Sequence, residues 1–132
     1  MSERRANIAL VEKWAALFNS GDVEMMIREC YHLDAEMRVM GRGAVTNHAD
    51  FLAFELAVSR AAPRRRITLE ALHPFDRGVI VESLLYNPDL GEDWTLPWCS
   101  LLTIVDGKIS SDRNYLDFSK WPSSDAIEQE MG

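Results

Sequence analysis

Asp112 and Asn114 are the side chains in this 132-residue chain whose types and spacing best fit proton chemistry. Two residues apart on an extended segment, they point to the same side of a strand. A carboxylate enclosed by apolar side chains loses hydration, which raises its pKa and lets it act as a general base or acid near neutral pH. The Asn114 amide can orient a water molecule or a substrate oxygen, but it is no base at neutral pH. We therefore predict a catalytic pair of Asp112 and Asn114; the alternative is that Asp112 reaches solvent at the strand end.

Tyr31, His32 and Asp34 form a second cluster of titratable side chains. A His–Asp pair can shuttle protons near neutral pH, whereas the plainer interpretation is a surface loop that contains a histidine. Glu82 is a further candidate carboxylate. Its side depends on the register of its strand, and it faces either the pocket or the opposite side, where it could pair with Arg113.

The cysteine and histidine spacing predicts no metal site and no reactive thiol. The two cysteines, Cys30 and Cys99, lack the CxxC spacing of metal or redox motifs. The three histidines show neither H-x-H nor H-x₃-H spacing, so a metal would need distant ligands to converge. Cys99 has no evident basic partner, and we expect a buried, inert thiol. We expect neither a metal nor a cofactor.

A long β-hairpin between Trp98 and Trp121 positions the candidate catalytic pair. An Asp-Gly pair between apolar runs, here Asp106-Gly107, is a strong signal for a two-residue hairpin turn. A regular ladder from that turn pairs Leu101 with Asp112 and Cys99 with Asn114. One face of the hairpin would then carry Cys99, Leu101, Asp112, Asn114 and Leu116, and the other Trp98, Ser100, Leu102, Ile104, Ile109, Arg113 and Tyr115. Since neither face is simply polar, we expect helices on one side and a partner subunit on the other.

The hydrophobic periodicity predicts three helices before most of the strands. In the third helix we expect Phe51, Phe54, Leu56 and Val58 to be buried, and Pro63 prevents its continuation. The expected helices cover residues 3–19, 22–30 and 48–61, and the expected strands before the hairpin cover 34–39, 65–73 and 79–87. This order predicts an α+β fold in which a curved antiparallel sheet of four long strands and one short strand wraps over the helices and leaves a conical pocket. We expect one domain over 1–132, in which the polar tail 122–132 either folds as a final turn or stays mobile.

Composition and charge exclude several classes of function. A net charge of −7 argues against nucleic-acid or anionic-membrane partners. No apolar run approaches the roughly 20 residues that span a bilayer, and the first residues do not read as a secretory signal. We therefore expect a cytoplasmic protein.

Two segments, GDVEMMIRECYHLDAEM and VDGKISSDRNYLDF, resemble the nuclear transport factor 2-like superfamily, with the SnoaL-like and limonene-epoxide-hydrolase-like branches closest. The resemblance covers residues 5–121 and is specific for fold rather than reaction. It implies a cone whose pocket takes a small, mostly apolar molecule. It also implies a homodimer through the outer sheet face, here Trp98, Leu102, Ile104 and Tyr115.

The known chemistry of these relatives does not carry over to this chain. By similarity, the last-strand aspartate of the epoxide hydrolases, which is also the position of the acid in SnoaL-type cyclases, falls on Asn114. Their Arg-x-Asp pair falls on Ser83 and Leu85, and their water-holding Tyr and Asn fall on Met37 and Val39. The tyrosine of the steroid isomerases falls on Trp14, and their aspartate on Val39 or nearby. The expected pocket residues are therefore Trp14, Met37, Val39, Ser83, Leu85, Cys99, Leu101 and Leu116.

The sequence thus predicts a fold and a pocket without a specific reaction. One hypothesis is cofactor-free acid–base chemistry on a polyketide-, steroid- or terpenoid-like molecule, meaning cyclisation, isomerisation, dehydration or hydrolysis. The other is a ligand-binding or dimeric scaffold protein that catalyses nothing. A buried Asp112 beside a ligand favours the enzyme, and an Asp112 that points to bulk water favours the scaffold.

Overall fold

The computed structural model describes residues 2–121, so the predicted polar tail, 122–132, lies outside the described residues. Each of the three helices begins at a side chain that caps its first turn. Ser2, Asp22 and Asn47 each accept a hydrogen bond from a backbone N–H three residues ahead, which satisfies a donor that the helix leaves free. Gly21 ends the first helix with a φ of 83°, a left-handed conformation that favours glycine. The helices are α1 (Glu3–Ser20), α2 (Val23–Cys30) and α3 (His48–Ala61).

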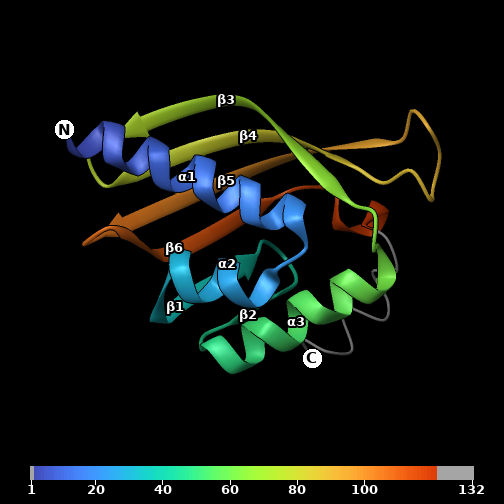
Figure 1. Cartoon of the computed structure of the whole chain (residues 1–132), viewed down its shortest axis with the longest axis horizontal. Helices are drawn as coiled ribbons and strands as arrows, with labels where there is room; N and C mark the ends of the chain where they lie inside the picture. The colour runs from blue at the N-terminus through green and yellow to red at the C-terminus, as the bar shows by residue number, and fades with distance from the viewer. Residues whose placement is uncertain (1, 122–132) are drawn as a thin grey trace.

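Six strands form one curved sheet in the order β2-β1-β6-β5-β4-β3 (Figure 1). The predicted α+β class is confirmed, but the sheet is mixed, because β1 pairs with β6 in parallel. The first strand begins at Tyr31 rather than 34, and the short strand β2, which was not predicted, follows it. The strands are β1 (Tyr31–Val39), β2 (Gly43–Val45), β3 (Arg66–Phe75), β4 (Gly78–Tyr86), β5 (Thr95–Val105) and β6 (Lys108–Tyr115).

The predicted hairpin turn is correct, and so are the first two residue pairs after it. Beyond these two pairs the predicted ladder is wrong. Asp106 and Gly107 both have positive φ, 50° and 79°, as a type I′ turn requires. Between Ile109 and Ser111 the register shifts, so that Ser110 is an extra residue in β6. Such a bulge changes which side chains share a face across the two strands. Asp112 therefore lies opposite Leu102, and not opposite Leu101 as a regular ladder would place it.

The bulge reverses the predicted faces of β5. Cys99 and Leu101, expected in the pocket, lie on the outer face opposite Tyr115 and Arg113. The residues expected at the dimer interface, with the exception of Tyr115, lie instead on the inner face: Leu102 and Ile104 are buried in the core, and Trp98 packs against it. Tyr115 stays on the outer face and is 37% exposed.

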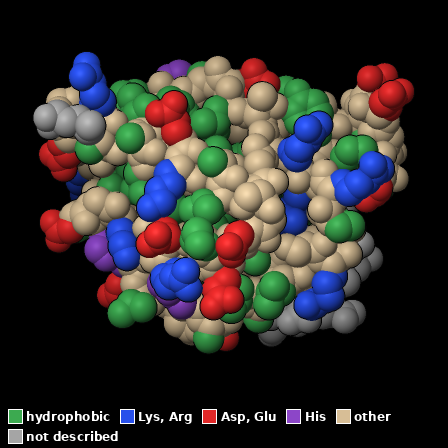
Figure 2. Space-filling model, viewed as in Figure 1, with side chains coloured by type: hydrophobic (Ala, Val, Ile, Leu, Met, Phe, Trp, Pro, Cys, Tyr) green, Lys and Arg blue, Asp and Glu red, His purple; other side chains and the backbone are tan. Residues whose placement is uncertain are grey.

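The three helices cover the concave side of the sheet (Figure 1). Helix α1 packs against β3 and β4, α2 packs against β1 and β6, and α3 packs against α2 and β1. Gly78 lies at a close approach of β4 to the β5 backbone, because a Cβ atom there would sit 1.7 Å from the Leu102 carbonyl oxygen. Figure 2 shows Lys and Arg side chains scattered among Asp and Glu on the face that it presents. None of the helices within 2–121 is long and apolar enough to cross a bilayer.

Candidate functional site

Asp112 lies on the inner face of β6 and is only 3% exposed. The Tyr31 hydroxyl donates a hydrogen bond of 2.6 Å to its Oδ2 atom. The other carboxyl oxygen, Oδ1, is buried and has no hydrogen-bond partner among the described residues. One oxygen is thus held in place, and the other is free to accept a proton or contact a ligand.

The surroundings of Asp112 shift its pKa into the range of acid–base chemistry. Burial raises the pKa of Asp112 to about 6, although the hydrogen bond from Tyr31 and the nearby Asn114 amide oppose the shift. Burial also raises the pKa of Tyr31 well above its usual value, and the charge of Asp112 adds to this rise. Tyr31 therefore keeps its proton and remains a donor while Asp112 changes its charge.

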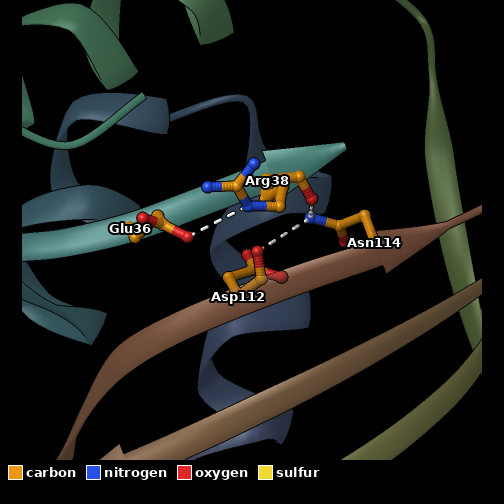
Figure 3. Close-up of polar contacts among 4 residues, drawn as sticks. All are labelled: Glu36, Arg38, Asp112 and Asn114. Carbon is orange, nitrogen blue, oxygen red and sulfur yellow. Dashed lines mark hydrogen bonds and ion pairs between the residues drawn. The ribbon is translucent and has the colours of Figure 1, made fainter. Parts of the chain in front are cut away.

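Asn114 ties the site to its neighbouring strands (Figure 3). Its Oδ1 atom accepts hydrogen bonds from Trp98 Nε1 and Ser100 Oγ, both at 2.8 Å. Its Nδ2 atom donates to the carbonyl oxygens of Arg38, at 3.2 Å, and Asp112, at 3.5 Å. These contacts use the hydrogen-bonding capacity of the amide, so its geometry fits a residue that positions Asp112.

Asp112 and Asn114 border a small cavity between the helices and the sheet. Its volume of about 30 Å³ holds roughly two water molecules, at about 10–15 Å³ each. Aromatic rings form much of its wall: Trp98 lies 5.8 Å from both Trp14 and Phe18 and 5.5 Å from Trp121, measured between ring centroids. Of the predicted pocket residues, Trp14, Met37, Val39 and Leu116 line this cavity.

Glu55 on α3 is a second carboxyl in the cavity wall. It is 8% exposed, and its Oε2 atom lies 3.7 Å from Arg65 Nη2, which is too long for a hydrogen bond. Burial raises the pKa of Glu55 to about 7; the Arg65 guanidinium opposes the rise, and the charge of Asp112 adds to it. The sequence interpretation missed this residue because it placed Leu56 on the buried face, whereas Leu56 is 42% exposed.

A signal for Glu55 does exist in the sequence. Glu55 follows Phe51 by four residues and precedes Val58 by three, the spacing that places side chains on one helix face. A glutamate within an apolar stripe is unusual, because charged side chains are rarely buried without a partner. The prediction assigned Leu56 to the wrong face of the helix, because residue 56 lies about 140° around the helix axis from the buried residue 51.

His32 and Asp34 do not line the cavity, although both belong to β1. His32 shares a hydrogen bond with the Val105 carbonyl, and His48 shares one with the His32 carbonyl. Of the two interpretations of this cluster, a His–Asp proton shuttle does not fit this cavity, because neither side chain lines it. Tyr31 is the member of that cluster that contacts the site.

A family model for the SnoaL-like domain matches residues 11–111. The chain belongs to the SnoaL-like family. The predicted resemblance to nuclear transport factor 2-like proteins is therefore confirmed. The matched range ends one residue before Asp112.

Solved structures show the same fold as this SnoaL-like domain. A candidate SnoaL-like polyketide cyclase from Jannaschia sp. CCS1 is 21% identical, with a TM-score of 0.75 over 90% of this chain and 91% of that one. TerC, co-crystallised with polyporic acid, is also 21% identical, with a TM-score of 0.75 over 93% and 98% of the two chains. IdmH, a candidate polyketide cyclase from Streptomyces antibioticus, is 15% identical, with a TM-score of 0.74 over 87% and 94%. No curated protein matches the sequence.

Several predicted site residues lie away from the cavity of this SnoaL-like domain. Ser83 and Leu85 are buried but do not line it, and Cys99 lies on the outer face. Glu82 also lies on the outer face, where its Oε2 atom is 2.6 Å from His73 Nε2 rather than beside Arg113. The pKa of the half-buried Cys99 thiol is raised by burial and by Glu82, which disfavours the reactive thiolate. Residues 2–121 contain no group of three His, Cys, Asp or Glu side chains that could hold a metal.

Proposed function

We propose that this SnoaL-like domain binds a small, largely apolar molecule in the aromatic cavity and moves a proton on it without a cofactor. The observation that carries the proposal is the asymmetric carboxyl of Asp112: Tyr31 holds Oδ2, whereas Oδ1 is buried and has no hydrogen-bond partner within residues 2–121. A pKa of about 6 suits a group that must both accept and return a proton near neutral pH.

Each neighbour of Asp112 has a distinct part in this proposal. Tyr31 stabilises the ionised carboxylate and restricts its rotation, so that Oδ1 faces the ligand. Asn114 fixes the strand that carries Asp112 through contacts with β5 and β1. The aromatic wall excludes water, and electrostatic interactions are stronger in such a site than in bulk solvent.

The solved structures with this fold support a substrate of polyketide-, steroid- or terpenoid-like character. TerC was co-crystallised with polyporic acid, and the other two are candidate polyketide cyclases. Cyclisation, isomerisation, dehydration and hydrolysis all need a proton carrier at a carbon or an oxygen. Epoxide hydrolysis by the known machinery is disfavoured, because by similarity Asn114, Ser83 and Leu85 occupy the positions of the required acids and arginine.

A second candidate function is ligand binding without turnover. The cavity of about 30 Å³ supports this alternative, because it is far smaller than the pockets of roughly 300–1,000 Å³ typical of drug-sized ligands. The saturated amide of Asn114 supports it as well, since that side chain has no free atom with which to hold a water molecule.

The substitution Asp112→Asn separates the two functions. The wild type is first screened against a panel of epoxides, enols and polyketide-like ketones. If Asp112 carries the proton, the variant loses turnover of any active compound by about 10²-fold or more while still binding it. Glu12→Gln, at an exposed position on α1, is the matched control and is expected to retain activity.

Unchanged turnover in Asp112→Asn would refute the acid–base assignment. Binding of a panel compound without turnover, equal in the wild type and the variant, would establish the non-catalytic function. Electron density for a co-purified molecule in the cavity would identify the ligand directly.

We further propose a cytoplasmic homodimer joined through the outer face of the sheet. A groove of about 320 Å³ on this face is lined by Leu84, Pro97, Cys99 and Tyr115, together with the carboxylates of Glu70 and Glu82. A second copy that covered this face would bury apolar surface worth about 25 cal/mol per Å².

A further inference from the structure

Four buried polar atoms in the cavity wall have no hydrogen-bond partner among the described residues. They are the Asp112 Oδ1, Glu55 Oε2, Trp14 Nε1 and Trp121 Nε1 atoms. Each such atom costs about 1–3 kcal/mol if it stays unsatisfied. The two carboxyl oxygens can accept hydrogens from a ligand, and the two indole N–H groups can donate to a ligand oxygen. Together they match a ligand with both acidic hydrogens and an acceptor oxygen.

Glu55 stands out among these groups because the proposed function leaves it without a role. It reaches the cavity from α3, whereas Asp112 reaches it from β6. The charged or titratable groups that act on it are the Arg65 guanidinium, the Asp112 carboxyl and the Tyr31 hydroxyl. Arg65 lies too far from Oε2 for a hydrogen bond and contacts Phe18 instead, 4.7 Å above its ring centroid.

We propose that Glu55 is a second catalytic residue, which acts as the general acid while Asp112 acts as the general base on an enolisable ketone. This inference rests on the proposed function and names the substrate class. Asp112 removes the proton from the carbon next to the carbonyl, and the C–H electron pair becomes the C=C bond of the enol. Glu55 gives its proton to the carbonyl oxygen, so one O–H bond forms as another breaks. The reverse transfers, at the same or another ligand atom, return both carboxyls to their starting states.

The environments of the two carboxyls fit this division of roles. Burial raises the pKa of both carboxyls, and the charge of Asp112 adds to the rise at Glu55, so ionisation of Asp112 favours the protonated form of Glu55. Pairs of titratable groups whose pKa values are pushed apart commonly divide into base and acid in this way. The indole N–H groups of Trp14 and Trp121 provide further donors for the developing oxyanion.

Hydrogen–deuterium exchange on a ketone measures this chemistry directly. Acetone, which requires a small widening of the cavity, and 2-indanone, which requires the aromatic wall to open, are incubated with the protein in D₂O. Loss of the α-hydrogen signal is followed by ¹H NMR across the pD range from 4 to 9. The expected profile is bell-shaped, rising as Asp112 ionises and falling as Glu55 loses its proton.

Glu55→Gln is expected to slow exchange at least about tenfold and to remove the fall at high pD. Asp112→Asn should abolish enzyme-dependent exchange, and the control Glu12→Gln should leave it unchanged. Unchanged exchange in Glu55→Gln, together with its loss in Asp112→Asn, would overturn the role of Glu55 and leave the proposed function standing. Exchange by the wild type at no more than the buffer rate for both ketones would overturn the enolisation proposal itself.

A measurement on the free protein tests the coupling of the two carboxyls without any ligand. Carboxyl ¹³C NMR gives the pKa of Glu55, which is expected near 7 in the wild type and lower in Asp112→Asn, because the neighbouring charge is gone. A normal pKa for Glu55, or no change in the variant, would overturn the proposed pairing. Glu55→Gln removes a buried charge, and its thermal unfolding curve verifies that it is folded.

Discussion

Asp112 and Glu55 place two carboxyl groups inside an apolar wall, and this arrangement links the stability of the fold to pH. Both pKa values are raised above their ordinary values of 3.8 and 4.5, so the folded state binds more protons than the unfolded state between about pH 4 and 7. Stability therefore falls as pH rises through this window. Below it both states are protonated, and the penalty disappears.

Asp112→Asn is predicted to stabilise the protein at pH 8. The expected gain is on the order of 2–3 kcal/mol, since each pKa unit corresponds to about 1.4 kcal/mol and Asn can still accept the Tyr31 hydrogen bond. Urea unfolding at pH 8 and at pH 4 measures the difference, which should vanish at the lower pH. If the difference in unfolding free energy between Asp112→Asn and the wild type is the same at pH 8 and at pH 4, the buried carboxyl does not titrate as described.

Tyr31→Phe is predicted to raise the pKa of Asp112 above about 6. The substitution removes the donor that stabilises the ionised carboxylate, so burial acts with less opposition. Carboxyl ¹³C NMR gives the titration midpoint. Tyr115→Phe, on the outer face, is the control and should leave the midpoint in place.

At the scale of single residues, the sequence predicted Asp112 and Asn114 on one face from their spacing alone. It did not predict the bond between Tyr31 and Asp112, because these residues lie 81 positions apart and meet only through the parallel pairing of β1 with β6. Glu55 was missed because the buried face of α3 was assigned to Leu56. Long-range pairing and helix phase were thus what the sequence interpretation lacked.

The elements around β6 hold the site together through one amide. Asn114 contacts Trp98 and Ser100 on β5 and the Arg38 carbonyl on β1, so it bridges three neighbouring strands. The bulge at Ser110 makes this bridge possible, because it turns Ser100 and Asn114 to the same face. A serine at position 110 does not indicate a bulge in the sequence. A regular ladder was therefore predicted from the two-residue turn.

Asn114→Ala is predicted to lower the free energy of unfolding by roughly 2–4 kcal/mol, because it leaves buried donors on β5 without a partner. Ser111→Ala, on the outer face of the same strand, should stay within about 0.5 kcal/mol of the wild type. Chemical denaturation of both variants tests the comparison. Equal stability of the two would mean that the bridge contributes nothing.

Gly78→Ala is predicted to destabilise the β3–β4 hairpin more than Gly107→Ala destabilises the β5–β6 turn. An added methyl group at position 78 collides with the Leu102 carbonyl, whereas position 107 has open space and only a positive φ of 79°. The turn variant should cost on the order of 1–3 kcal/mol, and the Gly78 variant more. Thermal melting ranks the two, and the opposite order would contradict the close approach of β4 to β5.

Within residues 2–121, helices cover one face of the sheet and leave the other face without such a cover. Half-exposed apolar side chains, among them Ile80, Leu84 and Leu101, lie on the uncovered face with the exposed Tyr115. The sequence predicted a two-faced sheet correctly, although the bulge changed which β5 residues belong to each face. The proposed dimer therefore rests on a different set of residues from the one first predicted.

Tyr115→Arg is predicted to shift the sedimentation mass towards that of one chain, because it places a charge in the proposed interface. Leu90→Arg, in the exposed β4–β5 loop, introduces the same charge elsewhere and should leave the mass unchanged. An unchanged mass for Tyr115→Arg at micromolar concentration would exclude this face as the interface.

Three of the four tryptophans, Trp14, Trp98 and Trp121, stand together in the cavity wall, with Trp98 5.8 Å from Trp14 and 5.5 Å from Trp121. Indole rings this close couple their electronic transitions, so the absorption and fluorescence of these tryptophans depend on the state of the cavity. A bound ligand that separates the indole rings would alter the near-ultraviolet circular dichroism spectrum and the wavelength of tryptophan fluorescence emission. Occupancy can therefore be followed by spectroscopy before the natural ligand has been identified.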